Sequence, residues 1–169
     1  MPKMGTKDAT YRYLSSLSLD LAEEPINGWT AGRVHLVEIA VPDAVTVDRI
    51  MTMIGGSGTG NVRFGIYKEG ATAHSPDGGE LVIESAAIDV SAYSRGLAAM
   101  TIAETALAAG IYFLAFQASA DTVYLYTSYD VVGVLGSYYD RAGGFGAFTD
   151  PCPETAAADR AATLGLRVT

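Results

Sequence analysis

Ile111-Tyr112-Phe113-Leu114-Ala115-Phe116-Gln117-Ala118 is the stretch of sequence that decides the fold class, because an extended chain with this sequence is apolar on both faces. Two apolar faces are typical of a strand in the middle of a sheet that is covered on both sides. The turn sequences Ala109-Gly110 and Ala120-Asp121 limit this stretch to the length of one strand. The sequence therefore predicts a central strand over residues 111–118.

Other segments with strand patterns lie on both sides of this one. They are short, rich in β-branched residues or alternately apolar, and separated by turn sequences. These segments are residues 34–39, 45–54, 62–67, 81–84, 88–90, 100–103, 123–127 and 164–168. About eight short strands predict an all-β fold, a jelly-roll-like antiparallel β-sandwich. One core is expected to contain Phe64, Ile66, Leu114, Phe116, Leu125 and Leu166.

The chain has 169 residues, the length of one domain. We expect an N-terminal arm over residues 1–31 and a β-sandwich domain over 32–169, with a long Tyr/Gly-rich loop at 128–162, where no clear strand pattern occurs. The spacing of the leucines in the arm fits either a helix or a strand. These leucines are Leu14, Leu17, Leu19 and Leu21. Because such apolar surface seldom stays exposed, we expect the arm to pack against a neighbouring subunit.

The composition argues against two classes of partner. With 19 acidic and 11 basic residues, the net charge is −8, and a surface of that sign repels the phosphate backbone of nucleic acids. No run approaches the about 18 apolar residues of a membrane-spanning helix. Met1–Asp8 leads into no apolar segment of the kind found in signal peptides. We therefore expect no nucleic-acid partner, no membrane insertion and synthesis in the cytoplasm.

Residues that could support catalysis or hold a metal are scattered along the chain. His35 and His74 each stand alone, whereas zinc needs ligands at close spacing. The glycine cluster at 55–60 precedes a strand pattern rather than a helix, so we interpret it as a hairpin loop and not as a phosphate loop. Cys152, the only cysteine, lies in an irregular stretch, and no nucleophile elbow occurs. The sequence therefore predicts a protein that is not an enzyme, with no catalytic residue, metal site or cofactor.

The sequence leaves calcium binding open. Asp77 with Glu80, and Asp121 with Asp130, are loop carboxylates of the type that binds calcium. Acidic loop residues are more often simply solvated, and the spacing does not decide between the two readings.

Tyrosine is the informative residue type in this chain. Five of its ten tyrosines fall within the sixteen residues from 124 to 139. A tyrosine side chain has a flat apolar body and a polar tip, and therefore suits protein interfaces and sugar stacking. The expected contact residues are Tyr124, Tyr126, Tyr129, Tyr138, Tyr139, Arg141, Phe145 and Phe148. For Tyr124 and Tyr126, a place in the core is an equally good interpretation.

The order of several motifs resembles a β-sandwich module of tailed-bacteriophage and prophage virion proteins, which occurs in tail fibres, spikes and decoration components. The motifs are GRVHLV at 32–37, VDRI at 47–50, VRFGIY at 62–67, LV at 81–82 and AGIYFLA at 109–115. They cover roughly residues 32–127. The chain departs from the pattern with Ala109 in place of proline, Phe113 in place of tryptophan and an enlarged turn at 75–80.

The resemblance implies a structural role in a virion, with no catalytic residues to carry over. It also implies a homo-oligomer, a trimer, which contacts other virion proteins or a glycan of the host surface. Whether the chain would be a capsid decoration protein or a tail-fibre component is left open. The alternative is a carbohydrate-binding β-sandwich that acts outside a virion. The mass of the purified protein separates the two, because a trimer favours the first and a glycan-binding monomer the second.

Overall fold

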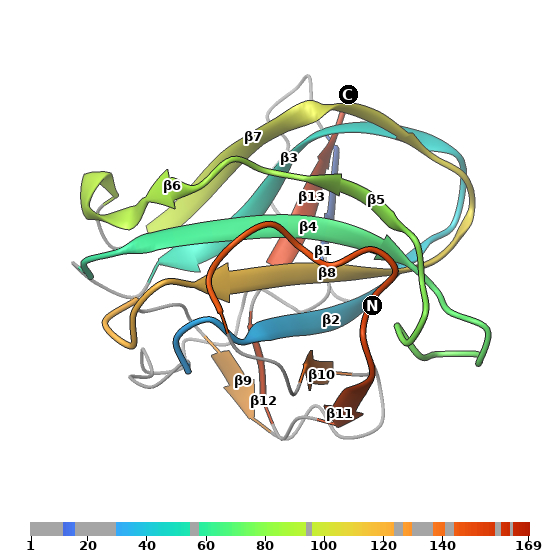
Figure 1. Ribbon diagram of the computed structural model, residues 1–169. Coiled ribbons are helices and arrows are strands. Elements are labelled where there is room, and N and C mark those ends of the chain that lie inside the picture. The colour runs from blue at the N-terminus through green and yellow to red at the C-terminus, as the bar shows by residue number, and fades with distance from the viewer. Residues whose placement is uncertain are drawn as a thin grey trace.

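The fold consists of two antiparallel sheets packed face to face (Figure 1). The computed structural model describes residues 12–15, 30–54, 58–93, 96–123, 127–129, 137–140, 144–157, 160–162 and 164–169.

The first sheet has the strand order β1-β13-β3-β7, and the second has the order β11-β10-β2-β8-β4-β5, with β6 also paired to β4. A third, two-stranded sheet joins β12 to β9. The strands of the first sheet are β1 (Arg12–Ser15), β3 (Val45–Ile54), β7 (Gly96–Leu107) and β13 (Leu164–Val168). Those of the second are β2 (Val34–Val41), β4 (Asn61–Lys68), β5 (Leu81–Glu84), β6 (Ile88–Asp89), β8 (Gly110–Ala118), β10 (Ser137–Asp140) and β11 (Thr155–Ala157). The remaining elements are β9 (Thr127–Tyr129), β12 (Arg160–Ala162) and a single 3₁₀ turn (Val90–Ala92).

Eight of these strands have the connectivity of a jelly roll. Taken in chain order they are β1, β2, β3, β4, β5, β7, β8 and β13. The first pairs with the last, the second with the seventh, the third with the sixth and the fourth with the fifth. Such a doubled ribbon, rolled into two sheets, defines the jelly roll. The all-β, jelly-roll-like sandwich predicted from the sequence is confirmed, and β9 to β12 are an insertion between its last two strands.

The central strand β8 is buried on both faces, as its sequence predicted. Leu114 and Phe116 point into the core between the sheets, while Phe113 belongs to a second apolar cluster on the opposite face. The predicted core is confirmed for the residues that the structure describes, which share the cluster between the sheets. They are Phe64, Ile66, Leu114, Phe116 and Leu166, whereas Leu125 lies outside the described residues.

Two expectations about the connecting segments are wrong. The 128–162 segment is not a single loop, because β10, β11 and β12 fall within it and β9 overlaps its start. Strands of three or four residues are too short to show an alternating pattern. The glycine cluster at 55–60 is no hairpin, since it connects β3 in the first sheet to β4 in the second. Of the strand expected over 123–127, the structure describes only the two end residues: Val123 is not in a strand, and Thr127 begins β9.

Part of the expected N-terminal arm belongs to the sandwich itself. Arg12–Ser15 forms β1, an edge strand that pairs with β13 of the same chain, with Leu14 opposite Leu166. For these residues the prediction that the arm packs on a neighbouring subunit instead of its own domain is wrong. Leu17, Leu19 and Leu21 lie outside the described residues. In the part of the chain that the structure describes, no helix is long and apolar enough to cross a membrane.

Candidate functional site

The outer face of the second sheet, which points away from the first sheet, carries an apolar cluster that the chain covers with its own later residues. We call residues 144–157 the strap, and Figure 1 shows its first part running across β4 and β8. Phe148 and Cys152 of the strap are buried against the cluster. The sheet contributes Val34, Leu36, Tyr67, Phe113 and Ala115.

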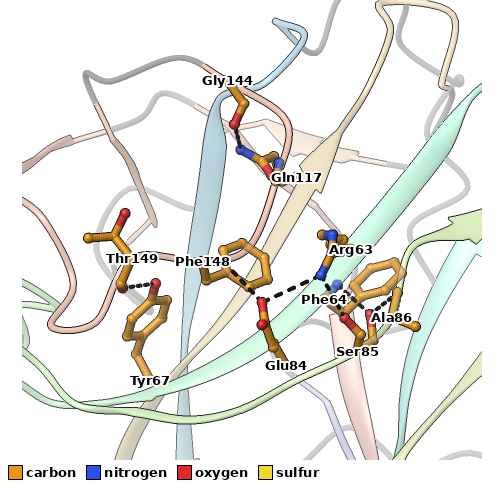
Figure 2. A network of polar contacts seen from close by, with 11 residues as sticks. Arg63, Phe64, Tyr67, Glu84, Ser85, Ala86, Gln117, Gly144, Phe148 and Thr149 are labelled. Atoms are coloured by element: carbon orange, nitrogen blue, oxygen red, sulfur yellow. Dashed lines mark hydrogen bonds and ion pairs between the residues drawn. The ribbon is translucent and has the colours of Figure 1, made fainter.

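Phe148 is the main apolar contact between the strap and the sheet. Its side chain is 7% exposed, and its ring meets the ring of Tyr67 edge-on, with 6.2 Å between the centroids. The glycine at position 65 gives the ring room to approach the strand, because a Cβ there would lie 3.0 Å from ring atoms of Phe148. The backbone amide of Phe148 donates a hydrogen bond to Oε2 of Glu84 at 3.0 Å, as Figure 2 shows.

The side chain of Gln117 holds the start of the strap through hydrogen bonds. Its Nε2 donates hydrogen bonds to the carbonyl oxygens of Gly32 and Gly144, each at 2.6 Å, and its Oε1 accepts one from the amide of Gly146 at 3.1 Å. Figure 2 shows the bond to Gly144. The side chain is 3% exposed. A buried amide needs partners for both its donors and its acceptor, and here all three bonds go to backbone groups. This arrangement fixes the position of Gly144–Gly146 over the end of β8.

Two further bonds hold the middle of the strap to the sheet. The Tyr67 hydroxyl donates to the carbonyl oxygen of Thr149 at 2.7 Å (Figure 2). The amide of Leu81 donates to Oδ1 of Asp150 at 3.0 Å. Both bonds come from the second sheet, which therefore holds the strap by polar as well as apolar contacts.

The far end of the strap is held by the loop that joins β4 to β5. The amide of Gly78 donates to the carbonyl oxygen of Cys152 at 2.9 Å, and the amide of Cys152 donates to that of Gly79 at 2.8 Å. Oδ1 of Asp77 accepts hydrogen bonds from the amide of Thr155 at 3.0 Å and from its hydroxyl at 2.6 Å. The enlarged turn noted in the sequence is thus a second anchor for the strap.

Arg63 of β4 and Phe145 of the strap form a polar and aromatic spot at the start of the strap. The Arg63 guanidinium lies 6.0 Å from the centroid of the half-buried Phe145 ring, within reach of a cation–π interaction. Nη1 of Arg63 also donates to the carbonyl oxygen of Ser85 at 3.3 Å and lies 3.7 Å from Oε2 of Glu84 (Figure 2). The Arg63 side chain keeps 23% of its surface exposed, so solvent can reach this spot.

Of the residues that we expected to form one contact surface, the structure describes the side chains of Phe145 and Phe148. The expectation that Phe148 contacts an external partner is wrong, because its ring is buried against its own chain. Its contact partner Gly65 lies far away in the sequence, so no local pattern could indicate this burial. Phe145 is half-buried.

The tyrosines of the expected surface are placed only in part. Tyr129 lies in β9, and Tyr138 and Tyr139 lie in β10, whose backbone pairs with both β2 and β11. The structure describes the backbone of these three residues and not their side chains. Tyr124, Tyr126 and Arg141 lie outside the described residues.

Three of the four carboxylates considered for calcium are described, and each of these has a protein partner. Asp77 accepts from Thr155, Glu80 pairs with Lys68 at 2.6 Å, and Asp121 accepts from the amide of Ala31 at 2.8 Å. Asp130 lies outside the described residues, and the described ones contain no group of three or more candidate metal ligands.

The two histidines differ in environment. His35 is 6% exposed and stacks on Phe116, with 5.1 Å between the ring centroids, so it lines the core as its place in an apolar strand suggested. His74 lies in an exposed loop, as expected, but the sequence did not indicate its partner, Glu38. Nδ1 of His74 lies 2.9 Å from Oε1 of Glu38, and this hydrogen bond raises the pKa of His74 above its ordinary value.

The described residues of the outer face thus form contacts within the chain, between the strap, the second sheet and the β4–β5 loop. No family model matches the chain, and no curated protein is significantly similar to it in sequence.

Proposed function

We propose that the chain is a non-enzymatic structural protein of a bacteriophage virion, a capsid decoration protein or a tail-fibre component, which assembles as a trimer. The observation that carries the proposal is the jelly-roll strand order, in which β1 pairs with β13 and β2 with β8. Double-sheet jelly rolls are a recurring unit of viral capsids. The order of the strand motifs over residues 32–127 supports the same role.

The strap is a second observation that supports an architectural role. It joins the β4–β5 loop, the sheet and the end of β8 through hydrogen bonds and through the buried ring of Phe148. The second sheet thus has one face on the core and the other under the strap. A domain held in one shape is suited to symmetric assembly, in which each copy must present the same surface.

Association with particles is the direct test of this role. Phage particles from a lysate of cells that produce the chain are banded in a density gradient, and peptides of the chain are quantified against those of the major coat protein. A fixed ratio between the two across the band supports the proposal. Presence of the chain only in the soluble fraction rejects it, and light scattering on the purified chain tests the trimer separately.

Tyr138 and Tyr139 are the proposed contact residues, and β10 holds their backbone at the side of the second sheet. The double variant Tyr138→Ala, Tyr139→Ala is expected to keep the melting temperature of the wild type and to lose incorporation into particles. Thr101→Ala, at an exposed position of β7, is the matched control. Normal incorporation of the double variant would exclude these tyrosines as the contact.

A carbohydrate-binding role outside a virion is the second candidate, and the spot formed by Arg63 and Phe145 favours it. A ring that is half-exposed beside a guanidinium can stack on a sugar while the cation binds its hydroxyl or carboxylate groups. A glycan array with the wild type and Phe145→Ala tests this candidate. Binding that the substitution abolishes supports it, and absence of binding by the wild type excludes it.

A further inference from the structure

Glu38 is a buried carboxylate on the outer face of the second sheet. It lies in β2 opposite Phe113 of β8, and its side chain is 7% exposed. Burying a carboxylate costs free energy unless a cation or hydrogen-bond donors compensate for the lost water. The compensating group comes from the loop between β4 and β5, where Nδ1 of His74 lies 2.9 Å from Oε1 of Glu38.

The backbone conformation of this loop places the side chain of His74 beside Glu38. His74 has a φ of +58°, in the left-handed region, and its amide donates a hydrogen bond to Oε1 of Glu69. Two turn hydrogen bonds span it, one from the amide of Gly70 to the carbonyl oxygen of Ser75 at 2.8 Å and one from the amide of Ser75 to the carbonyl oxygen of Thr72 at 3.1 Å. A left-handed residue that is not glycine needs surrounding contacts to hold it, and the bonds to Glu38 and Glu69 are such contacts.

His74 is the group of this loop whose type titrates near neutral pH. Glu38 faces it from β2 and Glu69 from the loop itself, and both favour the protonated imidazole. At the ends of the loop, Lys68 pairs with Glu80 at 2.6 Å, while the carboxylate of Asp77 is bound to Thr155. The hydroxyl of Tyr112 on the adjoining β8 donates to the carbonyl oxygen of Ala108 at 3.2 Å. Carboxylic acids, lysine and tyrosine ordinarily titrate well outside the range from about pH 6 to 8.5.

We propose that His74 and Glu38 form a pH-operated clasp, which holds the 69–80 loop on the second sheet while His74 is protonated and loosens it when the proton leaves. When the imidazole is neutral, the buried carboxylate of Glu38 loses its counter-charge. The closed position of the loop then loses the stabilisation that the ion pair contributes. The effect extends to the far end of the strap, because Gly78 and Gly79 of the same loop hold the backbone of Cys152.

The sign of the pH dependence follows from the raised pKa of His74. The stabilisation is fully present below the ordinary histidine pKa of 6.5 and is lost as the pH rises through the raised value. The clasp is therefore closed in mildly acidic solution and looser in mildly alkaline solution.

Hydrogen–deuterium exchange at about pH 6 and 8.5 tests the clasp, with rates corrected for the intrinsic effect of pH on exchange. In the wild type, protection of a peptide covering 69–80 should fall severalfold from the lower to the higher pH, while a peptide covering 111–118 stays unchanged. His74→Asn keeps a residue that tolerates the left-handed backbone but removes the charge, and it should show low protection at both pH values. Thr72→Ala, an exposed substitution in the same loop, should behave as the wild type.

The buried thiol of Cys152 gives a second readout. The alkylation rate of the wild type is divided by that of His74→Asn at the same pH, so that the ionisation of the thiol cancels. We expect a ratio well below one at pH 6 that approaches one at pH 8.5. A wild-type loop equally protected at both pH values, or a His74→Asn protein as protected as the wild type at pH 6, would overturn the proposal.

Discussion

The ring of Phe148 packs on the backbone of Gly65 so closely that a Cβ at position 65 would lie 3.0 Å from two ring carbons. The contact joins the strap to β4 across a large separation in sequence. It also shows why the VRFGIY strand carries a glycine in a position where a side chain would otherwise face the outer cluster. Two glycines of the chain permit a matched test of this contact.

Gly65→Ala is expected to destabilise the protein by about 1–3 kcal/mol, the usual range for overpacking a well-packed site. Gly146→Ala is the control, because a Cβ at that position has nothing within 4 Å. Thermal unfolding of both variants measures the difference. The double variant Gly65→Ala, Phe148→Ala should lose much less free energy of unfolding than the sum of the losses in the two single variants. Additive losses would show that the ring and the glycine do not interact.

Leu114→Ala tests the core between the sheets. Leu114 is fully buried in β8, with 0% of its surface exposed, and replacement by alanine leaves a cavity. We expect a loss of about 2–5 kcal/mol in the free energy of unfolding, measured by denaturant titration. A melting temperature within a degree or so of the wild type would contradict the placement of this strand.

Deletion of residues 1–15 should destabilise the sandwich, whereas deletion of residues 1–11 should have a smaller effect. The longer deletion removes β1, whose four residues pair with β13, and turns β13 into an edge strand. The loss of these cross-strand pairs is expected to cost about 1–4 kcal/mol. Equal melting temperatures for the two truncated proteins would show that β1 contributes nothing to the stability of the sheet.

Asp48→Asn tests an ion pair that depends on a bulge. Asp48 lies between Val47 and Arg49, where the register of β3 on β7 shifts, and it binds Arg167 of β13 through two hydrogen bonds. The hydrogen bond from Arg167 lowers the pKa of Asp48 below its ordinary value of 3.8. The stabilisation is therefore present above pH 3.8 and is lost as the pH falls through the lowered value.

The measurement for this ion pair is the free energy of unfolding between about pH 6 and 2, since carboxylates titrate within that range. The wild type should lose more stability on acidification than Asp48→Asn does. Asp43→Asn, at an exposed position in the turn between β2 and β3, should follow the wild type. Parallel curves for the wild type and Asp48→Asn would refute a contribution from the pair.

The sequence predicted the parts of the fold in which one strand carries its own pattern. Ile111–Ala118 carries apolar side chains on both faces, with Gln117 as the polar exception, and this pattern implies a central strand covered on both sides. The same reasoning located Phe64, Ile66 and Leu166 in the core. No knowledge of the pairing partner is needed for such a prediction.

The strap and the clasp could not be predicted in this way, because each depends on residues far apart in the chain. The sequence around Phe148 predicts an exposed aromatic residue in a glycine-rich segment, and only the structure shows that Gly65 lies beneath its ring. His74 likewise reads as a solvated loop residue until Glu38 is placed beside it. A pattern along the chain carries no information about such contacts.

The position of β13 in the first sheet has a consequence for the order of folding during synthesis. Its five residues lie between β1 and β3, although the ribosome adds them after every other described strand. A growing chain that already contains β1 to β12 therefore still has a gap in one sheet, because Val47 and Ile50 of β3 lack their neighbours Val168 and Leu166. Loop closure over such a distance is slow, as expected for sheets with many non-local contacts. We expect the nascent chain to stay open to proteases and chaperones until Leu164–Val168 has left the exit tunnel, and to close in one late step.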